Sequence, residues 1–251
     1  MANNMLNEQT WRRIPPRPDQ PARAVDVPGE RSMTVSGTVG KTSILLALAV
    51  VAGSVGWKQA ETLAQTSGFL FLLLFGGLLG LSWFTATRPR IAPVTGPIYA
   101  VVIGVFAGMI SAFYDAAYDG IVLQAVFATG AVFAVCLFLY SSGIVKVTKK
   151  FVAITVAATG GIMLMYLISI VLNLFGVRVG FLHDPSPIGI LVSVVICFVA
   201  ALNLFLDFEL VRQGVDRGAP TYMEWYCAFA LMATLIWLYL EMLRLLGKLR
   251  N

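Results

Sequence analysis

Long apolar runs separated by short polar loops fill most of this 251-residue sequence. About 20 helical residues cross a bilayer core of about 30 Å, so uncharged runs of this length predict membrane-spanning helices. Composition agrees, because 12% of the residues are charged, against about 25% in soluble domains. We predict an all-α integral membrane protein with spans at Thr42–Trp57, Ser67–Ala86, Pro97–Phe113, Ile121–Tyr140, Phe151–Phe175, Ile188–Val211 and Tyr222–Leu246.

The segment before the first span is polar and rich in proline and arginine. No apolar stretch of signal-peptide length follows its basic residues, so we do not expect it to be a cleaved leader. Its low hydrophobicity indicates a disordered tail. We therefore predict a disordered cytoplasmic tail over residues 1–40 and a transmembrane domain over residues 41–251.

Basic residues lie in alternate loops and predict the orientation of the chain. Arg88 and Arg90 follow the second span and three lysines follow the fourth, whereas the loop between has only Asp115 and Asp119. The positive-inside rule then places the N-terminus in the cytoplasm. Seven crossings leave the basic ending RLLGKLR outside, against that rule, so six spans with one re-entrant segment is the alternative. Because these charges are topology signals, they do not indicate a nucleic-acid partner.

Other motifs indicate packing rather than chemistry. Small residues spaced as GxxxG occur at Gly76 and Gly80 and at Gly104 and Gly108, a spacing that lets helices approach closely. We expect these to pack helices within one chain. Three cysteines inside apolar runs, without CxxC spacing, are expected to be buried packing residues.

The sequence argues against an enzyme. Its single histidine, His183, excludes bis-histidine haem ligation and HExxH zinc chemistry. The serine and aspartate motifs of intramembrane proteases are missing, and no inverted repeat of a coupled transporter is visible. We predict no cofactor and no firm metal site.

Asp207 ends a run of nineteen uncharged residues that begins at Ile188. A carboxylate beside hydrocarbon is costly, so it marks either a wetted interfacial anchor or a site that handles ions. An anchor would pair with Arg212, although five residues is a poor helical spacing. Asn203 lies one turn earlier on the same face, which favours an ion site. Glu209 points to another face and is predicted to be solvated.

Two further acids lie in the last span. Glu224 in its first turn is expected to be stabilised by the helix dipole. Glu241 is expected to form a surface ion pair with Arg244 near the outer interface. Thr234 precedes Glu241 by seven residues and shares its face, and Gln124 lies in the first turn of the fourth span.

Several segments have an ordered set of motifs, namely GPIYAVVIGVFAGMISAFY, QAVFATGAVFAVCLFLY, KVTKKF, LFLDFELVRQG and WLYLEMLRLLG. Together they resemble the Bax inhibitor-1 (transmembrane Bax-inhibitor-motif) family over residues 43–250. The resemblance implies six helices around a central seventh and a calcium leak gated by two aspartates that share a proton. Asp207 matches the first aspartate, but Thr234 stands where the second is expected. Gln124 stands where some members have an acid, and Arg88 or Arg90 matches an arginine of the second helix.

The leading hypothesis is a cation leak of the bacterial inner membrane, permeable to calcium and regulated by pH through Asp207. Asn203, Thr234 and Gln124 would line the path. The predicted charge partners are Arg88, Arg90, Arg212, Glu224 and Glu241. The alternative is a non-conducting regulator or scaffold that binds another membrane protein, such as a membrane-bound protease, through the N-terminal tail.

Overall fold

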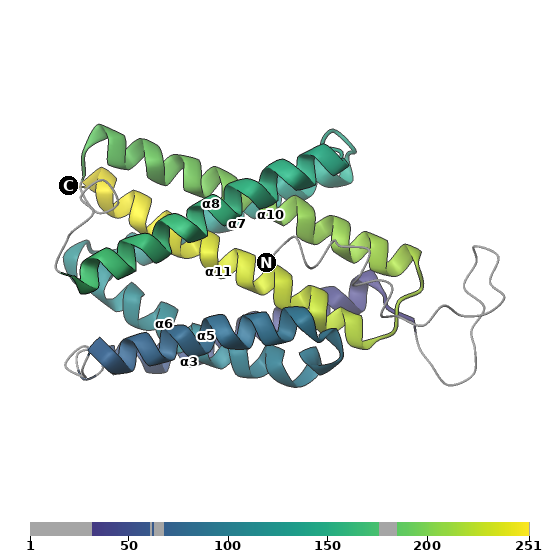
Figure 1. Ribbon diagram of the computed structural model, residues 1–251, viewed down its shortest axis with the longest axis horizontal. Helices are drawn as coiled ribbons and strands as arrows, with labels where there is room; N and C mark the ends of the chain where they lie inside the picture. Colours follow the sequence, from purple (N-terminus) through teal and green to yellow (C-terminus); the bar gives the residue numbers. More distant parts are fainter. Residues whose placement is uncertain (1–31, 61, 63–67, 176–184, 251) are drawn as a thin grey trace. The chain divides into compact units, whose positions relative to one another are not determined.

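The chain is all-helical in the computed structural model, which describes residues 32–60, 62, 68–175 and 185–250 (Figure 1). Of residues 68–75 and 174 only the backbone is described. No sheet forms in these ranges, where Ser32 and Pro220 make an isolated antiparallel bridge. The helices are α3 (Val35–Lys58), α5 (Gly68–Thr87), the 3-10 turn η1 (Pro89–Ile91), α6 (Ala92–Ala117), α7 (Ile121–Ser141), α8 (Lys149–Leu174), α10 (Pro187–Asp216) and α11 (Tyr222–Arg250).

Each predicted span overlaps one of the seven long helices. Among the described residues, six helices are long and apolar enough to cross a membrane; α5 is not one of the six. Large apolar side chains also cover the outside of several helices, as Phe127 and Phe138 do on α7 with 70% and 65% of their surface exposed. Such a surface suits lipid rather than water. The prediction of an all-helical integral membrane protein is therefore confirmed.

The predicted start of the first span is too late. Residues 35–40, assigned to the tail, form the first turns of α3. Thr34 is the N-cap, and its Oγ1 accepts a hydrogen bond from the backbone N–H of Gly37. Hydropathy missed this start because the capping turn is polar. The rest of the predicted tail, residues 1–31, lies outside the described residues.

The chain divides into two compact units, and α6, α10 and α11 contribute to both. The first unit contains residues 1–112 and 207–233, and the second contains residues 113–206 and 234–251.

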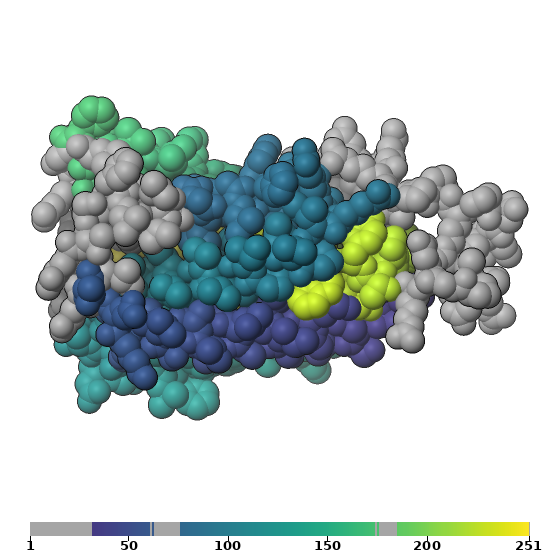
Figure 2. All heavy atoms as spheres, turned by 90° about the horizontal axis from the view of Figure 1, so that it is seen from below, coloured from purple at the N-terminus to yellow at the C-terminus, as the bar shows by residue number. Residues whose placement is uncertain are grey.

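In the first unit, α3 and α6 meet with almost no side chain between them. A Cβ atom added to Gly108 would overlap the backbone of Gly53, and one added to Gly104 would overlap that of Ala49. Figure 2 shows α3, in purple to dark blue, along the teal residues of α6. The GxxxG motif of α6 thus packs within the chain, as predicted.

The GxxxG motif of α5 differs from that of α6. Cβ atoms added to Gly76 and Gly80 would meet no described atom within 4 Å. The expectation that this pair also packs against another helix of the chain is therefore wrong for the described part of the structure.

The second unit is held together by apolar side chains from four helices. Leu243 of α11 is fully buried against Ile121 and Ala125 of α7. A second cluster joins Ile162 of α8 to Ile196 and Val199 of α10. All three cysteines, one of which (Cys227) belongs to the first unit, are buried and free, so their predicted role as packing residues is confirmed.

Candidate functional site

The four acids singled out in the late spans are buried, with exposed fractions of 7% for Asp207, 6% for Glu209, 4% for Glu224 and 2% for Glu241. Ionisable groups inside membrane segments are costly and are functional-site candidates by default. Two predictions are wrong here. Glu209 is not a solvated residue, and Glu241 is not at the surface, because neighbouring helices cover the faces that carry them.

Asp207 lies in the first unit on α10, where Phe208, Glu209 and Leu210 are also buried. A carboxylate in this setting is not a wetted interfacial anchor, so that alternative is wrong. Whether Asp207 handles ions stays a prediction.

Arg212, the predicted partner of Asp207, forms an ion pair with Glu209. Its Nε and Nη2 donate to the two carboxylate oxygens at 3.1 and 3.0 Å. Gln213 donates to the same carboxylate at 2.9 Å. Three- and four-residue spacings bring Arg212 and Gln213 to Glu209 on one face of the helix.

Asn203, the second predicted path residue, is buried in the second unit. Its Nδ2 donates to Oγ1 of Thr159 on α8 at 2.8 Å and to the backbone oxygen of Val199 at 2.8 Å. The amide therefore joins α10 to α8 as well as offering its oxygen as an acceptor.

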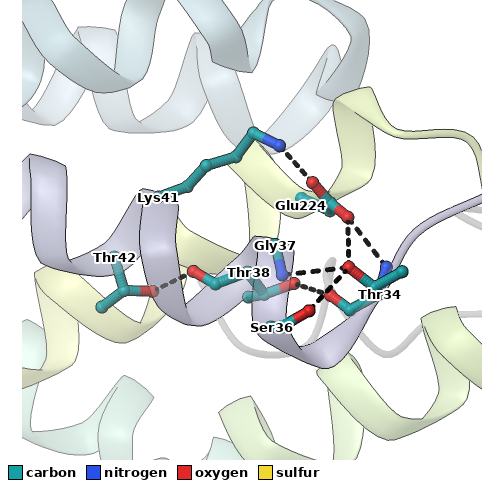
Figure 3. A network of polar contacts seen from close by, with 7 residues as sticks. All are labelled: Thr34, Ser36, Gly37, Thr38, Lys41, Thr42 and Glu224. Atoms are coloured by element: carbon teal, nitrogen blue, oxygen red, sulfur yellow. Dashed lines mark hydrogen bonds and ion pairs between the residues drawn. The ribbon is translucent and has the colours of Figure 1, made fainter.

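Glu224 is the centre of a polar cluster in the first unit (Figure 3). Oε1 accepts from the backbone N–H of Thr34 at 2.8 Å and from its hydroxyl at 3.0 Å. Oε2 forms an ion pair with the ammonium of Lys41 on α3, which also lies 5.6 Å from the centre of the Trp225 ring. Glu224 does lie in the first turn of α11, as predicted, but its charge is neutralised by Lys41 of α3.

Glu241 is the centre of a second buried cluster, in the second unit. Arg244 binds its two oxygens at 3.2 and 3.0 Å, which confirms the predicted pair. Tyr166 of α8 donates to Oε1 at 2.7 Å, and Arg244 also contacts the Tyr166 hydroxyl. The pair is therefore a buried link between α11 and α8 rather than a surface contact.

The remaining predicted residues are spread over both units. Thr234 is half-buried on α11 and Gln124 is exposed on α7, both in the second unit. Arg88 and Arg90 are exposed beside η1 in the first unit, where the Arg88 guanidinium lies 5.0 Å from the centre of the Phe84 ring. Neither unit therefore holds the complete predicted set.

Sequence reasoning did not single out Thr34, Lys41 or Tyr166 as partners of the buried acids. A threonine directly before an apolar helix is an N-cap signal and could have identified Thr34. No comparable signal exists for the other two, because their partners lie 183 and 75 residues away in the chain.

No group of three or more His, Cys, Asp or Glu side chains is placed to hold a metal within the ranges that the structure describes. Glu209, Glu224 and Glu241 are instead held by lysine, arginine, glutamine, tyrosine and threonine. This donor set suits single carboxylates that are matched by protein cations.

The sequence model of the family described as Bax inhibitor 1 like matches residues 3–251. The chain belongs to this family. No curated protein matches it in a direct sequence comparison. The match covers nearly the whole Bax inhibitor 1-like chain. It agrees with the family resemblance of the ordered motifs in the sequence.

Proposed function

We propose that this Bax inhibitor 1-like protein is a passive cation leak, permeable to calcium and regulated by protons through Asp207. The observation that carries the proposal is the burial of the Asp207 carboxylate in a membrane helix. Such a group is retained where ions or protons are handled, because a neutral side chain would be less costly. A proton and a cation compete for the same carboxylate, which couples passage to pH.

The proposed leak is weak. Calcium takes six to eight oxygen ligands, roughly, and a tight site combines several carboxylates. No cluster of three acids forms in the described ranges. A single carboxylate supports brief occupancy rather than storage. Asn203, Thr234 and Gln124 are the proposed oxygen donors of the second unit.

The proposed topology has seven crossings with a cytoplasmic N-terminus in the bacterial inner membrane. In the second unit, Arg250 donates to the backbone oxygen of Asp119 and Lys248 to that of Gly189. The end of α11 thus lies beside the α6–α7 connection and the start of α10, as alternating crossings require. These contacts argue against a re-entrant segment among α7, α8, α10 and α11.

The basic ending is compatible with an outer location, because its charges are engaged by the protein. Lys248 is buried and donates to Gly189 and Ser193, and Arg244 pairs with Glu241. Six helices around α11 is the arrangement that we propose from family membership. Within the first unit, Tyr226 and Phe229 of α11 are fully covered.

Calcium flux into liposomes that contain the purified protein tests the proposal. The wild type should conduct, and Asp207→Asn should lower the flux or flatten its pH dependence. Asp216→Asn, an exposed acid at the end of the same helix, is the matched control and should leave the flux unchanged. No flux at any pH, or equal effects of both variants, would refute the leak.

A regulatory role is the second candidate, favoured by the attachment of the N-terminal segment. The backbone N–H of Met33 donates to the carbonyl of Ala219 at 2.7 Å, so the residues just before α3 are attached at the α10–α11 connection. Deleting residues 1–31 spares these contacts. A leak keeps its flux after the deletion, whereas a tail-dependent regulator loses its membrane-protein partner.

A further inference from the structure

The start of α3 has half of a capping box. In a complete box, the N-cap hydroxyl binds the backbone N–H of the third helical residue, and a Glu at that third position binds the N–H of the N-cap. Thr34 provides the first half, since its Oγ1 accepts from the N–H of Gly37 at 2.9 Å. Gly37 is the third helical residue, and it has no side chain to provide the second half.

Glu224 of α11 provides the missing half from 190 residues away. The N–H of Thr34 donates to its Oε1 at 2.8 Å. A Cβ atom on Gly37 would overlap this carboxylate, so Glu224 occupies the space that a side chain at the third position would take. Figure 3 shows the carboxylate against the first turn of α3, between Thr34 and Lys41.

We propose that Glu224 completes the capping box of α3 in trans, so that the first turn of α3 is stable only while the start of α11 is docked against it. Lys41 lies one turn beyond Gly37 and neutralises the buried carboxylate. The hydrogen bond from the N–H of Met33 to the carbonyl of Ala219 attaches the residue before the N-cap to the α10–α11 connection. Movement of α11 therefore uncaps α3 and breaks the hydrogen bond between Met33 and Ala219.

This device lies within the first unit and does not depend on ion flux. Its role is conformational, because it makes the folding of one helix end conditional on the position of another helix. An ordinary capping box stabilises a helix locally. When a distant residue completes the box, the stability of the helix end depends on the tertiary structure.

Hydrogen exchange of the full-length protein in detergent or nanodiscs tests the proposal. Glu224→Ala should raise amide exchange over residues 34–40 by about five- to tenfold, as expected for the loss of a cap. Peptides from the second unit, such as residues 121–141, should be unchanged. Glu209→Ala removes another buried acid of the first unit and is the matched control, which should not change exchange at the start of α3.

The double variant Gly37→Glu/Glu224→Ala moves the carboxylate from α11 to the third position of α3. It creates the sequence of a conventional capping box and also an i, i+4 acid–lysine pair with Lys41. Exchange over residues 34–40 should return toward the wild-type rate. Gly37→Glu alone should disturb the site, because Glu224 already fills the space.

Unchanged exchange in Glu224→Ala would overturn the proposal. If Glu224→Ala does not fold, the double variant remains decisive, because a cap in cis should restore a monodisperse protein. A double variant as defective as Glu224→Ala would also overturn it.

Discussion

The hydroxyl of Tyr166 donates a hydrogen bond of 2.7 Å to Oε1 of Glu241, 75 residues further along the chain. The same carboxylate binds Arg244, and only 3% of its side chain is exposed. The link therefore joins α8 to α11 inside the second unit with two donors on one buried anion. A charge in this position is stable only with its partners present.

Arg244→Met should destabilise the protein by about 3–5 kcal/mol, because it leaves the Glu241 carboxylate buried without a cation. Tyr166→Phe removes one hydrogen bond to a charged group and should cost about 1.5–3 kcal/mol. Equilibrium unfolding in mixed micelles measures both values. Arg212→Met is the comparison, because the Arg212 side chain is 61% exposed and Gln213 still donates to Glu209 after its removal, so this variant should lose less stability than Arg244→Met. Equal losses for the two arginines would contradict this account.

Gly108→Ala should destabilise the first unit by at least about 1–3 kcal/mol, because its Cβ atom would force α3 and α6 apart. Gly80→Ala is the matched control, since it changes the second glycine of the other GxxxG motif and meets no described atom within 4 Å. It should be neutral or slightly stabilising, because alanine favours the helix. Thermal unfolding of the two variants side by side is the measurement.

Asn203→Leu and Thr159→Val each break the hydrogen bond between α10 and α8. Interhelical bonds of this kind contribute on average about 0.6 kcal/mol in membranes, so both variants should be mildly destabilised. If Asn203 also lines the cation path, Asn203→Leu should lower calcium flux clearly more than Thr159→Val. Equal fluxes would assign Asn203 a packing role alone.

Single cysteines at positions 119 and 249 should react with a membrane-impermeant maleimide from the same side, and one at position 146 from the opposite side. The expectation follows from the bond between Arg250 and the backbone of Asp119. Native cysteines should give little background, because all three are buried. Labelling of positions 119 and 249 from opposite sides would favour a re-entrant segment.

Hydropathy located the helices well because bilayer thickness constrains their length directly. Predicted and observed ends of α7 differ by a single residue, Tyr140 against Ser141. Ends with a polar turn were missed, as at Thr34, because capping depends on hydrogen bonds rather than on apolar content. The third span was also predicted to begin too late, at Pro97, whereas α6 begins at Ala92.

The candidate site was harder to predict than the helices. Residue spacing gives the face of a helix on which Glu209 or Glu241 lies, but not whether another helix covers that face. Both acids were therefore assigned to the surface and are buried. Pairs three residues apart, such as Glu241 with Arg244, are local and were predictable. Contacts with Lys41 or Tyr166 depend on the tertiary fold.

The backbone contact between α3 and α6 has a mechanical consequence. Two helices whose main chains touch at Gly53 and Gly108 leave no space for a file of water molecules along that line. Separating α3 from α6 would expose peptide groups without forming any compensating contact. The two helices should therefore move as one rigid body. A permeation route, if it opens, has to form along other helix boundaries.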